Sequence, residues 1–263
     1  MASAVMDHDT AEQFVGALGA RSGIIAMVGA GGKKSTMYRL LEAHRALGTR
    51  RIALTSTVQI ATAPDALDVE TVIVDGDAEA VIAGGQGRDR AYLLTGPPTK
   101  PGRFAGLPAE LIPDLHRRGG FEVSLVKADG ARMRMIKAPG DNEPALPGGV
   151  STILPIISAR AFGRPLEAKL VHRPERLTEV TGAAPGMPID ADHVARLLSH
   201  PDGALRRVGD ALIVPIINMV DNAERLAMAG EAARKALART DRFDRVVLAS
   251  MIGPSPLVDV ISR

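Results

Sequence analysis

The chain of 263 residues contains no cysteine, which excludes disulfide bonds, thiolate catalysis and cysteine-ligated zinc. Aromatic residues are scarce: there is no tryptophan, and only two tyrosines and five phenylalanines are present. No basic tract is interleaved with aromatic side chains, and the formal net charge is only +2. Because nucleic-acid-binding surfaces combine such tracts with positive charge, we expect no nucleic-acid partner.

Long apolar runs are also missing. No stretch of 18 apolar residues exists, which argues against a membrane span. The first 20 residues carry Asp7, Asp9 and Glu12 and lack the basic and apolar regions of a signal peptide. We therefore expect a cytoplasmic protein with no membrane partner. Its hydrophobic content of 46% and charged content of 24% are typical of globular domains.

Apolar segments alternate with helical patterns along the chain. Strands are predicted over 24–28, 51–55, 71–74, 91–95, 122–127, 151–157, 211–217 and 245–250, the last leading into a short tail. Helices are predicted from Asp9 or Thr10 to Leu18, from the first glycine-rich loop to Leu47, and over 78–83, 108–118 and 222–238. A loop is expected over 96–102, and Pro215 predicts a bulge or an edge position. This order predicts an α/β fold, a mostly parallel sheet with helices on both faces, in one domain of residues 1–263; a helix-rich segment at about 163–205 is the candidate for a subdomain.

A glycine-rich loop between the first strand and the next helix is the most informative stretch. Three glycines within four positions are followed by two lysines and two hydroxyls. Glycines let backbone N–H groups approach phosphate oxygens, the helix N-terminus adds a positive end, and lysine neutralises charge. We therefore expect the phosphate chain of ATP or GTP to bind here. The residues concerned are Gly29, Ala30, Gly31, Gly32, Lys33, Lys34, Ser35 and Thr36.

The register of this loop stays open. The pattern G-x-x-x-x-G-K-[ST] lacks its first glycine here, and the spacing Gly29-x-x-Gly32-Lys33 looks like the shorter loop of the Mur ligases. In that register Lys33 is the phosphate lysine, and Lys34 takes the place of the Mg²⁺-binding hydroxyl. A shift of one residue makes Lys34 the phosphate lysine and Ser35 the metal ligand.

A second motif lies at the carboxyl end of the strand predicted over 122–127. Asp129 follows this strand as in a Walker B element, where a carboxylate holds Mg²⁺ opposite the phosphate loop. We therefore expect Ser35 and Asp129 to bind Mg²⁺. Arg132, Arg134 and Lys137 come next, and their guanidinium and ammonium groups suit an anion. The predicted catalytic residues are Lys33, Asp129 and Arg132.

Other polar residues are candidates for substrate binding. Thr55, Ser56 and Thr57 lie at the carboxyl end of a strand, where ligands bind in open α/β sheets. His172 lies in a turn before a proline. Together with Arg132, Arg134 and Lys137, they form the predicted substrate-binding set.

Taken together, these motifs resemble the YqeC family, described as accessory proteins for selenium-dependent molybdenum hydroxylases. The resemblance runs from about Ile24 to Leu257 in the same order. The matching segments are Val28 to Lys33, Thr55 to Thr57, Ala128 to Arg132, Lys137 to Pro139, Glu143-Pro144, Pro147, His172-Arg173 and Asn218 to Asp221. The resemblance implies a role in maturing a molybdenum hydroxylase or its cofactor, with both as partners. It also implies that Asn218 and Asp221 read a nucleotide base.

Three residues depart from the family pattern. Lys34 stands where the family has a threonine, Lys127 replaces a glutamate, and Met219 replaces the lysine of an N-K-x-D motif. All three lie in loops expected to contact ligand, so nucleotide binding is better supported than hydrolysis.

Three functions therefore compete. The first is an Mg²⁺-dependent NTPase acting as an accessory factor. The second is a phosphoryl or nucleotidyl transferase or ligase, whose pterin-type acceptor is held by Arg132, Arg134 and His172. The third is a chaperone that binds a nucleotide or cofactor without turning it over, for which the cation at position 127 is the main argument.

Overall fold

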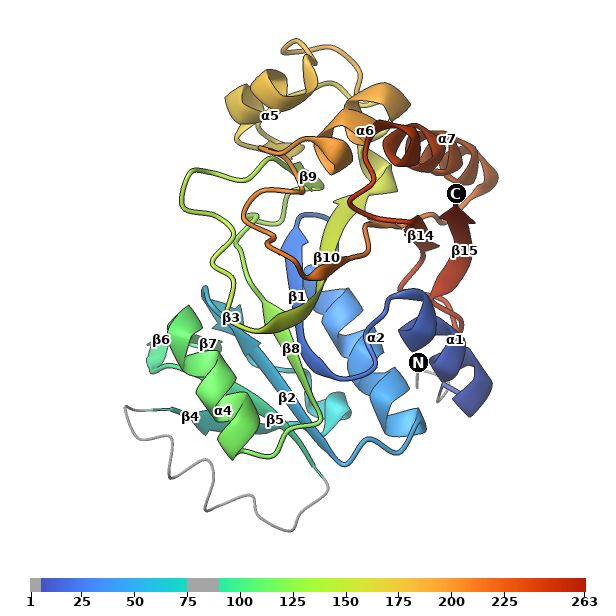
Figure 1. The fold of residues 1–263 in the computed structure, drawn as a ribbon. Coiled ribbons are helices and arrows are strands. Elements are labelled where there is room, and N and C mark those ends of the chain that lie inside the picture. Colours follow the sequence, from blue (N-terminus) through green and yellow to red (C-terminus); the bar gives the residue numbers. More distant parts are fainter. Residues whose placement is uncertain (1–5, 75–89) are drawn as a thin grey trace.

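The computed structural model describes residues 6–74 and 90–263, and the helix predicted over 78–83 falls outside them. In this part of the chain the central sheet has ten strands, in the order β15-β14-β13-β10-β1-β8-β2-β5-β4, with β12 also beside β10 (Figure 1). All neighbours are parallel except β14 and β15. The strands are β1 (Gly23–Gly29), β2 (Arg51–Ser56), β4 (Glu70–Ile73), β5 (Arg90–Thr95), β8 (Val123–Lys127), β10 (Val150–Ser158), β12 (Leu212–Ile213), β13 (Ile216–Asn218), β14 (Arg245–Ala249) and β15 (Leu257–Ser262).

Helices cover both faces of the sheet, which confirms the predicted fold class. Ile25 and Met27 of β1 pack with α1 and α2 on one face, whereas Ile24, Ala26 and Val28 point into the core beneath α4 to α7. This alternation follows from the period of two in a strand, and a central strand buried on both faces is apolar throughout. The helices are α1 (His8–Ala17), α2 (Lys33–Ala46), α4 (Ile112–Arg118), α5 (Pro174–Thr181), α6 (Ala191–Ser199) and α7 (Ala223–Arg239). Helices α5 and α6, from the helix-rich segment, share their apolar cluster with α7 and the sheet.

Helix ends follow capping chemistry. The first helix is capped by Asp7, whose carboxylate accepts the Thr10 N–H, so it begins earlier than predicted. Asn222 caps α7 in the same way through the Arg225 N–H. After α2, Gly48 adopts a φ of +76°, and the helix ends within one residue of the predicted Leu47.

Two small sheets lie beside the main one. Strands β3 (Ile60–Ala61), β7 (Arg103–Phe104) and β6 (Pro98–Lys100) form an antiparallel sheet, so the prediction of a loop throughout 96–102 is wrong. Proline is tolerated there because β6 is an edge strand. The second sheet pairs β9 (Ile136–Lys137) with β11 (Val171–His172). Short 3₁₀ helices cover Asp65–Leu67, Ala109–Leu111 and Ala159–Ala161.

The carboxyl-terminal part of the sheet differs from the prediction at two points. Pro215 interrupts the strand expected over 211–217 and divides it into β12 and β13. The second piece lies between β10 and β14, so the edge position is wrong, and the Pro215 carbonyl still accepts the Val247 N–H. The expected tail forms β15, whose Leu257 and Val260 pack on one core and Ile261 on the other. The sequence did not predict this strand, because a half-exposed edge strand lacks the apolar run by which the inner strands are recognised.

The chain order changes direction at β1. Strands β8, β2, β5 and β4 lie on one side of it, and β10, β13, β14 and β15 lie on the other. Ligands of open α/β sheets bind at such a point, beyond the carboxyl ends of the strands. The glycine loop leaves β1 at this end. Among the described residues, no helix has the length and apolar character needed to cross a membrane.

Candidate anion-binding site

The glycine loop is pressed against the ends of two neighbouring strands. Gly31 has a φ of +90°, and a Cβ placed there would lie 2.5 Å from the Ser158 Cβ and 2.6 Å from the Ser158 nitrogen. Real Cβ contacts do not come this close, and L side chains rarely adopt this φ. A glycine is therefore required at this position for the loop to pass the end of β10.

The loop opens directly into α2. Gly32 occupies the N-cap and offers no side-chain hydrogen bond to the helix. The first-turn N–H groups of a helix have no partner within it, and together they form its positive end. The first backbone hydrogen bond of the helix comes from Thr36. Its N–H and its hydroxyl both donate to the Gly32 carbonyl. An anion at the loop would meet the positive end of a 14-residue helix.

Asn218 supports the loop from below. Its Nδ2 donates to the Gly31 carbonyl at 2.9 Å, and the side chain is buried. Asp221, three residues on, accepts from Ser250 at 2.8 Å and pairs with Arg160 and Arg225. The residues predicted to read a base are thus engaged with the protein itself, Asn218 under the loop and Asp221 away from it.

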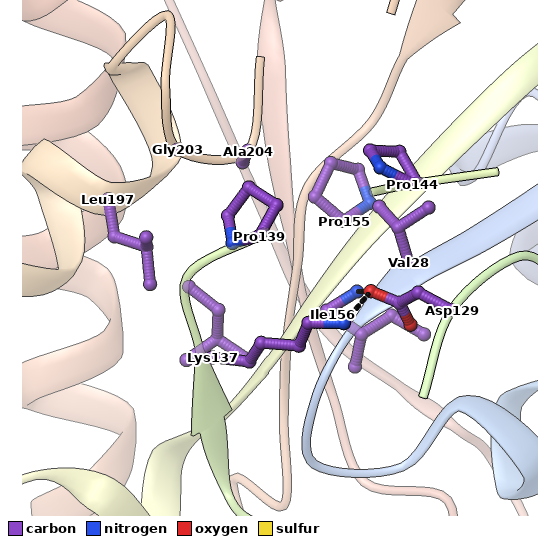
Figure 2. A pocket seen from close by; sticks show the side chains of 12 residues that line it. Val28, Asp129, Lys137, Pro139, Pro144, Pro155, Ile156, Leu197, Gly203 and Ala204 are labelled. Atoms are coloured by element: carbon purple, nitrogen blue, oxygen red, sulfur yellow. Dashed lines mark hydrogen bonds and ion pairs between the residues drawn. The ribbon is translucent and has the colours of Figure 1, made fainter. Parts of the chain in front are cut away.

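The Asp129 carboxylate joins the loop to β8, at whose end it lies. Its Oδ2 accepts the Gly29 N–H at 2.8 Å. It also accepts from the Lys137 ammonium at 2.9 Å (Figure 2). The Lys33 ammonium lies 2.8 Å from Oδ1, an ion pair without hydrogen-bond alignment, and also donates to the Gly29 carbonyl. Asp129, Lys33 and Lys137 are 2%, 6% and 3% exposed. Burial lowers the pKa of Lys33, with Asp129 acting in the opposite direction.

The ion pairs continue away from the loop. The Lys137 ammonium lies 2.8 Å from Glu143, and Glu143 accepts from Arg173 at 2.6 Å. Burial alone would raise the pKa of Glu143, but hydrogen bonds from Arg173 and Lys137 lower it to about 2. We call Lys33, Asp129, Lys137, Glu143 and Arg173 the charge cluster. Sequence reasoning gave Glu143 and Arg173 no role, although both lie in motifs that match the family pattern.

Beside the loop lies an open cavity of about 570 Å³, within the range of small-ligand sites. It lies between the start of α2, the end of β8, the segment 130–135 and the strand β3. Six basic residues border it, and none of the described residues that line it is acidic. The six are Lys33, Lys34, Arg103, Lys127, Arg132 and Arg134. We call this cavity the cationic cleft.

Four basic residues of the cleft lack acidic partners in the part of the chain that the structure describes. No ion pair within the described residues involves Lys34, Arg103, Arg132 or Arg134. The rim carries Met133, which is 90% exposed, and both it and Arg132 have positive φ values, +61° and +44°. Such backbone is costly for non-glycine residues and is concentrated at functional sites. Arg103 was missed by sequence analysis, because only the small antiparallel sheet brings it here.

Lys127 lies on the wall of the cleft and donates to the Gln59 carbonyl at 2.8 Å. Burial, followed by the repulsion of Lys33 and Lys34, lowers the pKa of Lys127 to about 8. A phosphate group bound nearby would favour its charged form. The cleft is therefore electrostatically suited to a polyanion.

Several predicted substrate-binding residues lie elsewhere. Thr55 donates to the Leu94 carbonyl at 2.8 Å and Ser56 donates to the Lys127 carbonyl at 2.9 Å, so both hydroxyls tie strand ends together. Thr57 donates its N–H to the same Lys127 carbonyl. Lys137 is buried in the charge cluster, and His172 pairs with it across β9 and β11. None of these five residues lines the cationic cleft.

The predicted Mg²⁺ ligands do not fit that ion. Ser35 is exposed in the cleft, but Asp129 does not line it and has its carboxylate engaged by Gly29, Lys33 and Lys137. Magnesium requires several oxygen ligands in octahedral geometry. Among residues 6–74 and 90–263, no group of three histidine, aspartate or glutamate side chains is placed to hold a metal.

A second cavity lies on the other side of the charge cluster. Asp129 and Lys137 border it together with apolar side chains such as Pro139, Pro144 and Leu197 (Figure 2). Its volume of about 30 Å³ leaves room for no more than a water molecule or two. It is therefore part of the packing around the charge cluster and not a ligand site.

Fold and site together define an α/β protein in which a glycine loop joins the central strand to a helix beside a basic cleft. Residues 25–175 match the model of the family described as YqeC protein, and the chain belongs to the YqeC family. It is 28% identical over 200 residues to the uncharacterized protein YqeC of Escherichia coli strain K12, which is 72% of each chain.

Two solved structures also show similarity. The hydrogenase maturation factor HypB from Archaeoglobus fulgidus aligns with a TM-score of 0.40 and 14% identity, over 93% of this chain and 89% of that one. HypB from Helicobacter pylori in complex with nickel aligns with a TM-score of 0.38 and 10% identity, over 93% and 86%. Similarity at this level has no bearing on function.

Proposed function

We propose that the protein binds the phosphate chain of a nucleoside triphosphate in the cationic cleft. The observation that supports this most is the combination of six basic residues with no acidic one, beside a glycine loop and an uncapped helix start. Backbone N–H groups, a helix N-terminus and lysines are the usual means of holding phosphates. ATP, GTP and a molybdenum cofactor nucleotide all carry linked phosphate groups that these features could hold.

The two lysines of the loop take different places in this proposal. Lys34 is exposed in the cleft and meets the phosphates directly, with the Ser35 hydroxyl beside it. Lys33 lies beneath, at the junction of the loop and the charge cluster, and reaches the phosphates by leaving Asp129. Arg132 and Arg134 close the opposite side of the cleft and bind the remaining anionic oxygens.

The proposal favours binding over hydrolysis. Phosphoryl transfer to water needs a group that positions or deprotonates the water. None of the described residues lining the cleft is a carboxylate, and Lys127 presents a cation on its wall. We propose that the protein acts as an accessory factor that carries or presents its ligand. Following the resemblance given above, its client is a molybdenum hydroxylase or the cofactor of that enzyme.

Calorimetric titration of the full chain with ATP, GTP and a molybdenum cofactor nucleotide tests binding. Lys34→Ala should weaken the affinity about tenfold, the equivalent of 1.4 kcal/mol, because it removes one ammonium from the phosphates. Lys235→Ala is the matched control, since that lysine lies on α7 and pairs with Glu231 at the surface. If no nucleotide binds, or if the two variants behave alike, the proposal is wrong.

Product analysis with labelled nucleotide separates the three competing functions. If the protein only binds, the nucleotide is broken down no faster than in the absence of the protein. Free phosphate alone would indicate a hydrolase, and a labelled pterin-type acceptor would indicate a transferase.

A further inference from the structure

We infer that the cationic cleft binds its triphosphate without a divalent cation, with the ammonium groups of Lys34 and Lys127 standing where Mg²⁺ would neutralise the phosphates. This inference rests on the proposed function, because it concerns how the same cleft holds the same ligand. It comes from the disagreement between the predicted metal ligands and the residues present.

The first argument is the state of Asp129. Its Oδ2 lies 2.9 Å from the Lys137 ammonium and 2.8 Å from the Gly29 nitrogen. Lys137 is fixed in the interior by a second carboxylate, Glu143, at 2.8 Å, and by the Gly130 carbonyl at 2.6 Å. Even if Lys33 moves toward a ligand and vacates Oδ1, a dication bound there would face this buried ammonium on the other oxygen of the same carboxylate. Coulomb repulsion at such a distance is large wherever water is excluded.

The second argument is what the cleft offers in place of a metal site. Among the described residues that line the cleft, side-chain oxygens belong to Ser35, a hydroxyl, and Gln59, an amide, and both are neutral. Lys34 is the neighbour of Ser35, and Lys127 is close enough to Lys33 and Lys34 for their charges to repel. A hard dication prefers several anionic oxygens, and here it would enter a field of six cations.

The third argument is charge balance. A metal-free triphosphate carries more negative charge than its magnesium complex, so it gains more from each ammonium or guanidinium group. Four of the six basic residues, namely Lys34, Arg103, Arg132 and Arg134, have no acidic partner within the described chain. The cleft therefore favours the free polyanion over the metal complex.

Titration calorimetry of the full chain with ATP and with GTP, in excess Mg²⁺ and in EDTA, tests the inference. The expected affinity in EDTA is equal to that in Mg²⁺ or up to about tenfold tighter. A loss of about tenfold or more in EDTA overturns the inference but leaves the proposed function standing. Absence of binding in both buffers overturns both.

Binding by variants is a second, independent test of the inference. Lys34→Thr places a hydroxyl where an ammonium now lies, at an exposed position that tolerates substitution. The double variant Lys34→Thr with Lys127→Glu supplies a hydroxyl and a carboxylate for a metal. Both should bind about tenfold more weakly in EDTA than the wild type, and Mg²⁺ should restore the double variant. Near-ultraviolet circular dichroism checks folding, and Lys235→Thr is the control. If Mg²⁺ has the same effect on the wild type and the double variant, the inference fails.

Discussion

At the scale of single residues, Gly31 is packed too closely against its neighbours to carry a side chain. Its φ of +90° and the neighbouring Ser158 leave no space for a side chain. Gly31→Ala should therefore displace the loop, weaken nucleotide binding more than tenfold and cost about 1–3 kcal/mol of unfolding free energy. Gly48→Ala is the control, because Gly48 has a φ of +76° but no atom near its Cβ, so only the backbone cost applies. Urea unfolding and calorimetry measure both effects, and equal behaviour of the two variants would contradict the packing argument.

His44 is a buried residue whose protonation opposes folding. Its Nε2 lies 3.0 Å from the Ala20 carbonyl and its Nδ1 lies 3.0 Å from the Thr49 hydroxyl. Burial lowers the pKa of His44 below its usual 6.5. The unfolded chain therefore takes up this proton first as pH falls, and stability decreases below pH 6.5, by up to about 1.4 kcal/mol per pH unit. Urea midpoints between pH 5 and 8 should depend less on pH in His44→Gln than in the wild type, and parallel curves would contradict this.

At the scale of elements, Lys137 holds β9 to the end of β8 through Asp129, and to the following loop through Glu143. Lys137→Met leaves two carboxylates with one cation fewer in the interior. Breaking a buried ion pair in this way costs about 3–5 kcal/mol. Lys235→Met removes a surface pair with Glu231 and should cost less than about 1 kcal/mol. Urea unfolding compares the two, and similar losses would show that the charge cluster contributes little.

The elements also show what a sequence can and cannot predict. The unit β1, glycine loop and α2 was predicted because every signal in it is local: an apolar run, glycines, and a helical repeat. The position of Asp129 beside the loop follows from the general rule that parallel strands end at one edge of the sheet.

Other parts of the site depend on contacts between distant segments. Arg103 reaches the cleft only through the pairing of β3 with β7, across about 40 residues of chain. Lys137 was predicted to bind substrate together with Arg132 and Arg134, but it lies in the β9–β11 pair and is buried. Asn218 matched a base-reading motif, yet it supports the Gly31 carbonyl, because strand order places the end of β13 under the loop. No local pattern encodes these neighbours.

At the scale of the whole molecule, nucleotide binding should raise thermal stability. A ligand at 100 times its dissociation constant contributes about 2.7 kcal/mol to the folded state. For a chain of this size that corresponds to roughly 5–10 °C in Tm. Differential scanning fluorimetry with ATP or GTP should show this shift, and Lys34→Ala should show a smaller one at the same concentration. Adenosine, which lacks phosphates, should give no shift; an equal shift would mean that the cleft does not read the phosphate chain.

The charge cluster has one more consequence for the molecule. It holds three cations, Lys33, Lys137 and Arg173, against two carboxylates, Asp129 and Glu143. When Lys33 turns toward a ligand, the charges of the four groups left behind sum to zero, and Oδ2 of Asp129 keeps its hydrogen bonds from the Lys137 ammonium and the Gly29 N–H. The Lys33 side chain can therefore turn to an incoming polyanion without leaving an uncompensated net charge in the interior.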